Sequence, residues 1–143
     1  MVGNVDLDLL EKTYQNASMG ITAIKAILDK TSNKELNEQL RQQLKDYQEL
    51  AQKSRQQLKA HNVEVKEPTY TKAMMKGNVK MKTLMDDSDS HIAQMVIQGS
   101  TMGVTQMLKL LNAKNNADNT SVEIAREFVK KEEQNIEKMK KFL

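Results

Sequence analysis

The chain has 143 residues, which suffice for one hydrophobic core and are few for two. Its 22 basic and 19 acidic side chains leave a net charge of only +3, so the charge balance does not require an acidic partner, and a pI near 9 is weak support for nucleic-acid binding. Cysteine is absent, which excludes disulfides and thiolate chemistry, and the low content of proline, glycine and aromatic residues favours long helices over strands.

The N-terminal residues do not have the pattern of a targeting signal. Asp6, Asp8 and Glu11 stand where a signal peptide would carry basic residues and then an apolar run. No apolar stretch of the sequence approaches the roughly 20 residues that a membrane-spanning helix needs. These features predict a cytoplasmic protein.

Hydrophobic spacing predicts a first helical hairpin over 5–61. Apolar or small residues recur at alternating steps of three and four, as on one buried helix face, over 5–29 and again up to about His61. The second helix begins after a capping-box pattern, Ser32 followed by Glu35. The buried positions expected in the two helices are Leu7, Leu10, Tyr14, Ala17, Ile21, Ile24 and Leu28, and then Leu36, Leu40, Leu44, Tyr47, Ala51, Ser54 and Leu58.

The connection 62–87 is too long for a tight turn and predicts a helix of its own at about 71–85, after Pro68. A connection that runs the length of a bundle needs about this many residues, so we expect a crossover topology rather than an up-down-up-down one. The segment 71–85 contains methionines interleaved with four lysines, and it has no acidic residue. Such a strip predicts either a helix that packs its methionines on the bundle or a surface for lipid, RNA or an acidic protein. The lysines are Lys72, Lys76, Lys80 and Lys82.

A second hairpin is predicted over 88–143, with a capping box at Thr120 and Glu123. Its segment 98–105 (QGSTMGVT) resembles 15–22 (QNASMGIT) at a shift of 83 residues, so the two halves look like copies. The small residues of both copies would let helices approach closely or would fit the core. The stripes of this hairpin are Ala93, Ile97, Ser100, Val104, Met107 and Leu111, and then Val122, Ala125, Val129, Glu132, Ile136, Met139 and Leu143.

Two related hairpins joined by a long crossover resemble the ferritin-like superfamily, in a bacterial branch from which the metal ligands are largely absent. Members of the superfamily place a glutamate on one helix of each hairpin and Glu-x-x-His on the other. One carboxylate survives among the matching positions, so the resemblance does not extend to a di-iron or di-manganese centre. Those positions are Tyr14, Tyr47, Leu50, Ile97 or Gly99, Glu132 and Asn135.

Glu132 is the one carboxylate within a buried stripe. A bare carboxylate in an apolar layer must be protonated, hydrogen-bonded or reached by water. Tyr14 and Tyr47 lie equally far from the first turn, so we expect their phenols in the same layer as donors to Glu132, in a cluster that fixes helix register. A small-molecule or single-metal pocket around Glu132 and an exposed Glu132 are the alternatives.

Acidic residues and a histidine gather before the third helix. Asp86, Asp87, Asp89 and His91 have the spacing of a weak metal chelate. Short polar residues before a helix also cap it, and acidic charge there complements the helix dipole, so capping is the preferred interpretation. His61, at the far end of its helix, should lie a bundle length from His91.

These patterns predict one all-α domain over 1–143, a four-helix bundle with no catalytic residue, metal or cofactor. Its predicted role is that of a non-enzymatic structural or protein-interaction module. Two alternatives remain: a ferritin-like metal-binding protein with a non-standard site around Glu132, and a lipid or nucleic-acid adaptor acting through 71–85. Ten methionines could supply the surface of a homodimer, although the sequence does not locate it.

Overall fold

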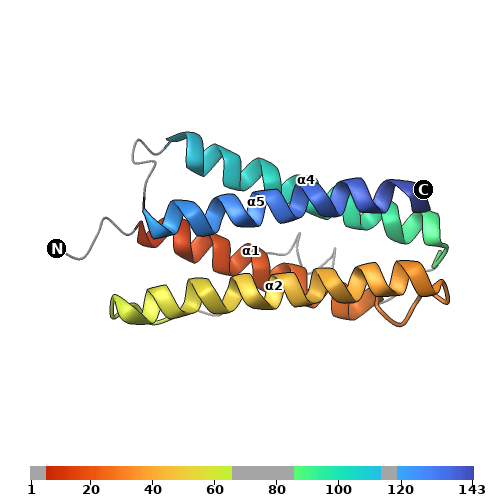
Figure 1. Cartoon of the computed structure of the whole chain (residues 1–143), viewed down its shortest axis with the longest axis horizontal. Coiled ribbons are helices and arrows are strands. Elements are labelled where there is room, and N and C mark those ends of the chain that lie inside the picture. The colour runs from red at the N-terminus through yellow and green to blue at the C-terminus, as the bar shows by residue number, and fades with distance from the viewer. Residues whose placement is uncertain (1–5, 66–85, 114–118) are drawn as a thin grey trace.

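The structure, a computed structural model, describes residues 6–65, 86–113 and 119–143. Within these ranges the chain forms four long helices and no strand, which confirms the expected all-α class. The helices are α1 (Leu7–Ile27), α2 (Lys34–Ala60), α4 (Asp89–Ala113) and α5 (Thr120–Met139), and a short 3-10 helix, η1 (Lys140–Phe142), follows α5 (Figure 1).

The helices pair in chain order, α1 along α2 and α4 along α5, and α5 also contacts α1 and α2. The start of α4 is tied to the α1–α2 connection, because Asp89 accepts hydrogen bonds from Thr31 Oγ1 (2.7 Å) and Asn33 Nδ2 (3.0 Å). Since α2 ends at the opposite end of the bundle, the chain leaves α2 at one end and enters α4 at the other (Figure 1). The predicted helix 71–85 and its four lysines lie outside the described residues.

Asparagine, rather than serine or threonine, caps the second helix of each hairpin. Asn33 Oδ1 accepts from Leu36 N (3.1 Å), and Asn119 Oδ1 accepts from Val122 N (3.0 Å). The predicted caps were therefore wrong by one residue in each case. Asparagine is as good an N-cap as serine, so the sequence offered two adjacent caps of equal strength at both sites.

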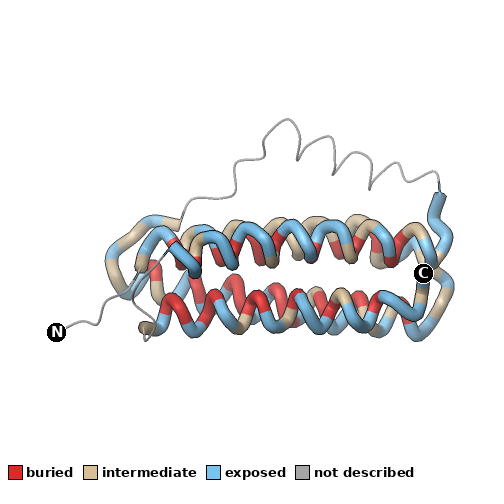
Figure 2. Tube along the Cα trace, turned by 90° about the horizontal axis from the view of Figure 1, so that it is seen from above, coloured by how far each residue is buried: buried red, intermediate tan, exposed pale blue. Residues whose placement is uncertain are grey.

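The predicted stripes form most of the core, and Figure 2 shows buried positions on the sides of the helices that face one another. Two stripe residues at the ends are exposed, Leu7 at 38% and Leu143 at 61%. Six others are only half-buried, namely Ile21, Leu28, Leu44, Ile97, Val104 and Ile136. Leu7 is the first residue of α1 and Leu143 follows η1, so each has packing partners on one side only. None of the described helices is both long and apolar enough to span a membrane.

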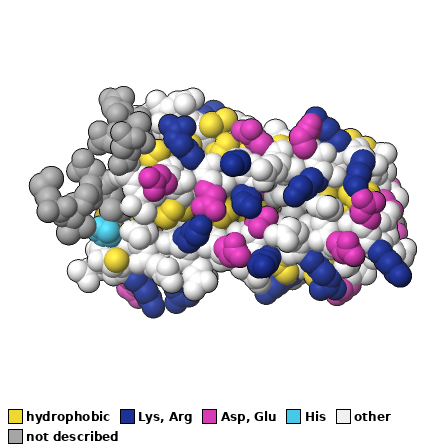
Figure 3. All heavy atoms as spheres, viewed as in Figure 1, with side chains coloured by type: hydrophobic (Ala, Val, Ile, Leu, Met, Phe, Trp, Pro, Cys, Tyr) yellow, Lys and Arg dark blue, Asp and Glu magenta, His cyan; other side chains and the backbone are white. Residues whose placement is uncertain are grey.

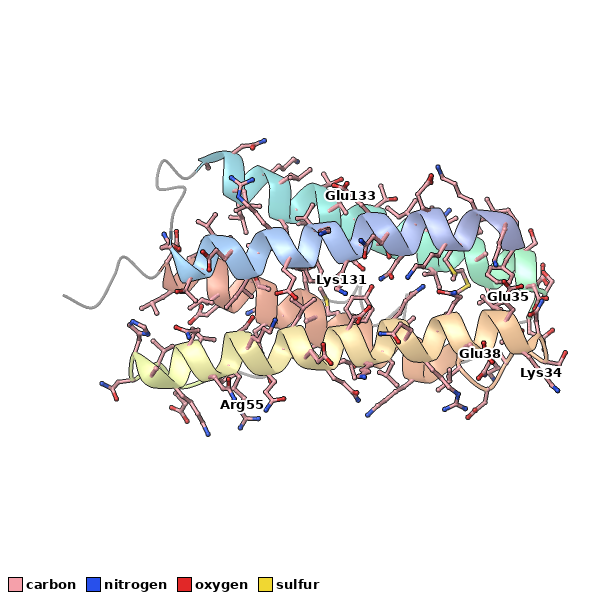
Figure 4. The ribbon with its side chains drawn as sticks, viewed as in Figure 1. Lys34, Glu35, Glu38, Arg55, Lys131 and Glu133 are labelled. Carbon is pink, nitrogen blue, oxygen red and sulfur yellow. The ribbon has the colours of Figure 1, made fainter. Side chains whose placement is uncertain are left out.

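The face formed by α2 and α5 carries interspersed acidic and basic side chains (Figure 3). Lys131 lies on the side of α5 that faces α2, whereas Glu133 lies on the opposite side (Figure 4). Ion pairs connect α2 with α5 and η1 along this seam. The pairs in which both partners are exposed contribute little to stability, whereas Asp46 is buried. The pairs along the seam are Lys53–Glu127 (3.0 Å), Lys131–Asp46 (3.8 Å) and Lys141–Glu35.

Candidate functional site

A cavity of about 220 Å³ lies between α1 and α4, with side chains of α2 and α5 as its floor. Its walls are almost entirely apolar or small. The floor consists of Tyr47 from α2 and of Phe128 and Glu132 from α5. The wall residues are Asn16, Met19, Gly20, Ala23, Ile24 and Ile27 from α1, and Met95, Val96, Gly99, Ser100, Met102, Gly103 and Gln106 from α4.

The internal repeat supplies the centre of both walls. Four residues of α1 that line the cavity have counterparts on α4 at the same shift of 83 residues, and all four counterparts line it too. The cavity therefore lies between two copies of one sequence segment, which face each other from antiparallel helices. The pairs are Asn16 and Gly99, Met19 and Met102, Gly20 and Gly103, and Ala23 and Gln106.

Glu132 holds the centre of the floor and is only 3% exposed. Its Oε1 atom accepts hydrogen bonds from one side chain on each of three helices, namely from Tyr47 Oη, from Ser100 Oγ (3.3 Å) and from Asn135 Nδ2 (3.2 Å). Among the described residues, no donor reaches Oε2. One carboxyl oxygen is thus fully engaged by the protein, and the other is left for the cavity.

Burial raises the pKa of Glu132 to about 7, although the hydrogen bonds from Tyr47, Asn135 and Ser100 each lower it. Burial also raises the pKa of Tyr47 well above 10, and the neighbouring Glu132 carboxylate adds to that rise. Tyr47 is therefore a neutral donor throughout the physiological range. Glu132, in contrast, gains or loses its proton close to neutral pH.

Two glycines make room for the floor. A Cβ atom at Gly20 would lie 2.7 Å from Tyr47 Cε2, and one at Gly103 would lie 3.0 Å from Glu132 Oε2. The ring of Tyr47 also packs against Phe128, with ring centroids 6.3 Å apart. Gly99 differs, because a Cβ atom there would meet nothing within 4 Å. The expected close approach of helices at the small residues thus does not occur at Gly99, which borders open space.

Methionines flank the cavity where it opens to solvent. Met19 and Met95 are half-buried, and Met102 is 64% exposed. Methionine has three rotatable bonds and a polarizable sulfur, so it adapts to apolar molecules of different shape. The rim can therefore move its side chains without a change in the helices.

Tyr14 does not join the Glu132 cluster, which corrects the expectation that both phenols would lie in one layer. Tyr14 is buried beside Leu58 and Val65, whereas the ring of Tyr47 lies against Gly20. Helical side chains lean toward the N-terminus of their own helix. In an antiparallel hairpin this carries Tyr47 toward the α1–α2 connection and Tyr14 away from it, although their backbones are equally far from the turn.

The acidic group before α4 forms local contacts. Hydrogen bonds from the side chain of Ser88 and from its backbone N–H (3.0 Å to Oδ1) lower the pKa of Asp86. Ser88 Oγ in turn accepts from His91 N (3.2 Å) at the start of α4. Asp87 is exposed, and Asp89 accepts from the α1–α2 connection as described above. His61 lies at the opposite end of the bundle, at the C-terminus of α2. Among the described residues, no three His, Asp or Glu side chains gather as metal ligands would.

Sequence reasoning missed two partners of Glu132. Ser100 was placed in the buried stripe of α4 but not near the carboxylate, and Asn135 was named only as the position of the histidine in Glu-x-x-His. The signal for Asn135 was available, because residues three apart on a helix are neighbours and an amide can donate to a carboxylate. No sequence signal marked Ser100, since its contact depends on how α4 packs against α5.

The groups around Glu132 are better suited to a proton on the carboxyl than to a bound metal ion. Hydrogen-bond donors occupy Oε1, and no second carboxylate or imidazole lines the cavity among the described residues. A divalent ion needs several oxygen or nitrogen ligands. The arrangement can hold one proton near neutral pH or accept one hydrogen bond from a molecule in the cavity.

Comparison with known proteins gives a likeness in fold. No protein-family model matches the chain, and no curated protein matches it in sequence. Its structure is similar to the crystal structure of a DUF305 fragment from Deinococcus radiodurans, with a TM-score of 0.76 and 12% sequence identity over 94% of this chain and 92% of that one. At this identity the likeness shows a shared all-helical fold.

Proposed function

We propose that this chain is a non-enzymatic binding module with a ferritin-like bundle, which takes one small and largely apolar molecule into the cavity between α1 and α4. The observation that carries the proposal is a cavity of about 220 Å³ with apolar walls and one buried carboxyl group in its floor. An apolar cavity of roughly 150 Å³ is large enough for benzene, so this one has room for a somewhat larger molecule.

The small residues of the walls support binding over a purely structural role. Protein interiors are close-packed, and voids larger than a water molecule are few. Glycine in a helix costs about 1 kcal/mol relative to alanine. Gly99 incurs this cost without giving room to a neighbour, because nothing lies within 4 Å of a Cβ atom there. A residue that lowers stability and keeps space open is expected where the space is used.

The described lining of the cavity has no histidine, lysine or arginine beside Glu132, which supports a non-enzymatic role. General acid–base or nucleophilic catalysis needs a reacting group and a partner within hydrogen-bond reach. Of the described residues around the cavity, Glu132 alone changes its charge near neutral pH, and Tyr47 holds it as a donor. This pair can bind and orient a molecule. The hydroxyl beside it, Ser100 Oγ, donates to the same carboxyl oxygen as Tyr47 at 3.3 Å, and no histidine, lysine or arginine in the described lining would activate it.

Binding can be tested with a neutral apolar probe. In an NMR titration of ¹⁵N-labelled protein with n-hexanol, amide shifts should concentrate in the cavity-lining segments 16–27 and 95–106. Gly99→Leu and Ala23→Leu narrow the cavity from opposite walls and should weaken hexanol binding at least tenfold. Gln98→Leu, at an exposed position of α4 outside the cavity, is the matched control and should bind like the wild type.

The proposal fails if hexanol shifts no amide of these segments. It also fails if both narrowed variants, shown by circular dichroism to be folded, bind hexanol as tightly as Gln98→Leu. If only one of the two substitutions weakened hexanol binding, the binding site would not lie between the two walls, and this result would also count against the proposal.

A further inference from the structure

We infer that the molecule taken into the cavity is a small aliphatic primary amine, bound as its ammonium ion by Oε2 of Glu132. This inference rests on the proposed function and deepens it, since it names the chemical class of the ligand. Three features of the cavity favour such a ligand: the charge of its lining, its unused hydrogen-bond acceptors, and the length of its apolar part.

The charge of the lining selects against anions. Glu132 is the only acidic residue among the described residues that line the cavity, and no lysine, arginine or histidine lines it. A carboxylic acid or a phosphate would enter a site with no cation to pair with it, beside a carboxylate. A cation would find one opposite charge, and burying an ion is tolerable only when it is paired and hydrogen-bonded.

The free hydrogen-bonding groups near the carboxyl are acceptors. Tyr47, Ser100 and Asn135 all donate to Oε1, which leaves Oε2 without a donor among the described residues. One turn from Gly20 on the α1 wall, Asn16 uses its Nδ2 to donate to Lys12 O (2.9 Å), and its Oδ1 accepts nothing from the described residues. A primary ammonium group has three donors and no acceptor, so it complements this set.

The cavity extends past the carboxyl group along apolar walls. On α1 the lining continues from Gly20, beside the floor, to Ile27, a rise of roughly 10 Å at 1.5 Å per residue. This length suits a short alkyl chain. The residues along it are Ala23, Ile24 and Ile27 from α1, and Met95, Val96 and Gly99 from α4.

Ammonium binding should depend on pH, because it draws on the ionised form of Glu132. The pKa of that carboxyl is raised by burial to about 7, so affinity for an amine should rise with pH up to about 7 and level off above it. The α1 wall presents no charged side chain, and Asp46 pairs with Lys131 on the α2–α5 seam instead of in the cavity. The groups that face Glu132 are neutral donors: Tyr47 from α2, Ser100 from α4 and Asn135 from α5.

Three probes with the same alkyl chain test the inference by calorimetry at about pH 8: n-hexylamine, n-hexanol and sodium hexanoate. We expect hexylamine to bind at least tenfold more tightly than hexanol, and hexanoate to bind more weakly than hexanol. In Glu132→Gln the preference for amine over alcohol should fall below threefold, while hexanol binding persists. Between about pH 8 and pH 5, the affinity for hexylamine should fall on the order of 50-fold or more, since about one carboxyl in 100 is ionised at pH 5, and the affinity for hexanol should stay constant.

The outcomes separate this inference from the proposed function. Equal affinities for hexylamine and hexanol, or an amine preference that survives Glu132→Gln, would overturn the choice of ligand and leave the cavity as a binding site. Tighter binding of hexanoate than of hexylamine would overturn it as well. Failure of hexanol to bind, alone or together with the other two probes, would defeat the proposed function itself.

Discussion

Replacing Glu132 by glutamine should remove a large part of the pH dependence of folding. The carboxyl has a pKa of 4.5 as its ordinary value and about 7 in the folded protein. Between these values the folded state binds more protons than the unfolded state, so the free energy of unfolding falls as pH rises from about 4.5 to 7. At about 1.4 kcal/mol per pH unit, this interval corresponds to a loss of roughly 3 kcal/mol in the wild type.

Urea unfolding, followed by helical circular dichroism at about pH 4 and pH 8, measures this effect. At pH 4 the protonated carboxyl and the amide are nearly isosteric, so wild type and Glu132→Gln should have similar stability. At pH 8 the variant should be the more stable by up to about 3 kcal/mol, or roughly 10 °C in Tm for a chain of this length. Other groups titrate in the same range, but they are common to both proteins and cancel in the difference.

Glu133→Gln is the matched control, because it removes one carboxylate from the adjacent, exposed position on the opposite side of α5 (Figure 4). Its stability relative to wild type should change little between the two pH values. If the stability difference between wild type and Glu132→Gln were the same at pH 4 and pH 8 within about 0.5 kcal/mol, the pKa of Glu132 would not be raised in the folded protein, and the prediction would be wrong.

Three further substitutions test the packing by the same urea titration. Gly99→Ala should stabilise the protein by about 1 kcal/mol, because alanine has the higher helix propensity and its Cβ meets no neighbour there. Gly20→Ala should destabilise the protein by about 1–3 kcal/mol, because its Cβ would lie 2.7 Å from the ring of Tyr47, and equal effects of the two substitutions would contradict this difference. Gln43→Met should raise stability by about 1–3 kcal/mol, since both amide atoms of this 1%-exposed side chain lack partners among the described residues, and a loss would indicate a partner. Asp89→Ala should cost about 1–2 kcal/mol through the two hydrogen bonds that tie α4 to the α1–α2 connection, and an unchanged midpoint would show that this tie is not stabilising.

Much of the fold could be predicted, because hydrophobic spacing records which helix faces are buried. The stripes located α1, α2, α4 and α5 to within a few residues. The predictions of the helix caps were wrong, because each was a choice between neighbouring residues of similar capping strength. Asn33 and Ser32 are adjacent residues with similar capping strength, so nothing in the sequence decides between them.

The candidate site was predictable in part. The sequence marked Glu132 as an acid within a buried stripe, and the structure places Tyr47 on it. Tyr14 was misplaced because depth in the bundle was judged from backbone position, while the position of a ring also depends on the direction in which the side chain leans. A pocket around Glu132 was one of the alternatives that the sequence left open, but its walls and volume could not be predicted, since they depend on how far α1 and α4 stand apart. The repeat was visible in the sequence, but only the packing of α1 against α4 shows that its two copies form the facing walls of the cavity.

The acid and the phenol in the floor occupy corresponding places, each being the fourth member of the stripe on the second helix of its hairpin. If both hairpins had the same residue at this place, two identical side chains would face each other there. Two carboxylates in that setting would compete for one proton, and two phenols would offer no anion. The difference between the two hairpins at this pair sets a donor, Tyr47, against an acceptor, Glu132. A variant with tyrosine at both places should therefore fold into a similar bundle and have no buried anion in the floor of its cavity.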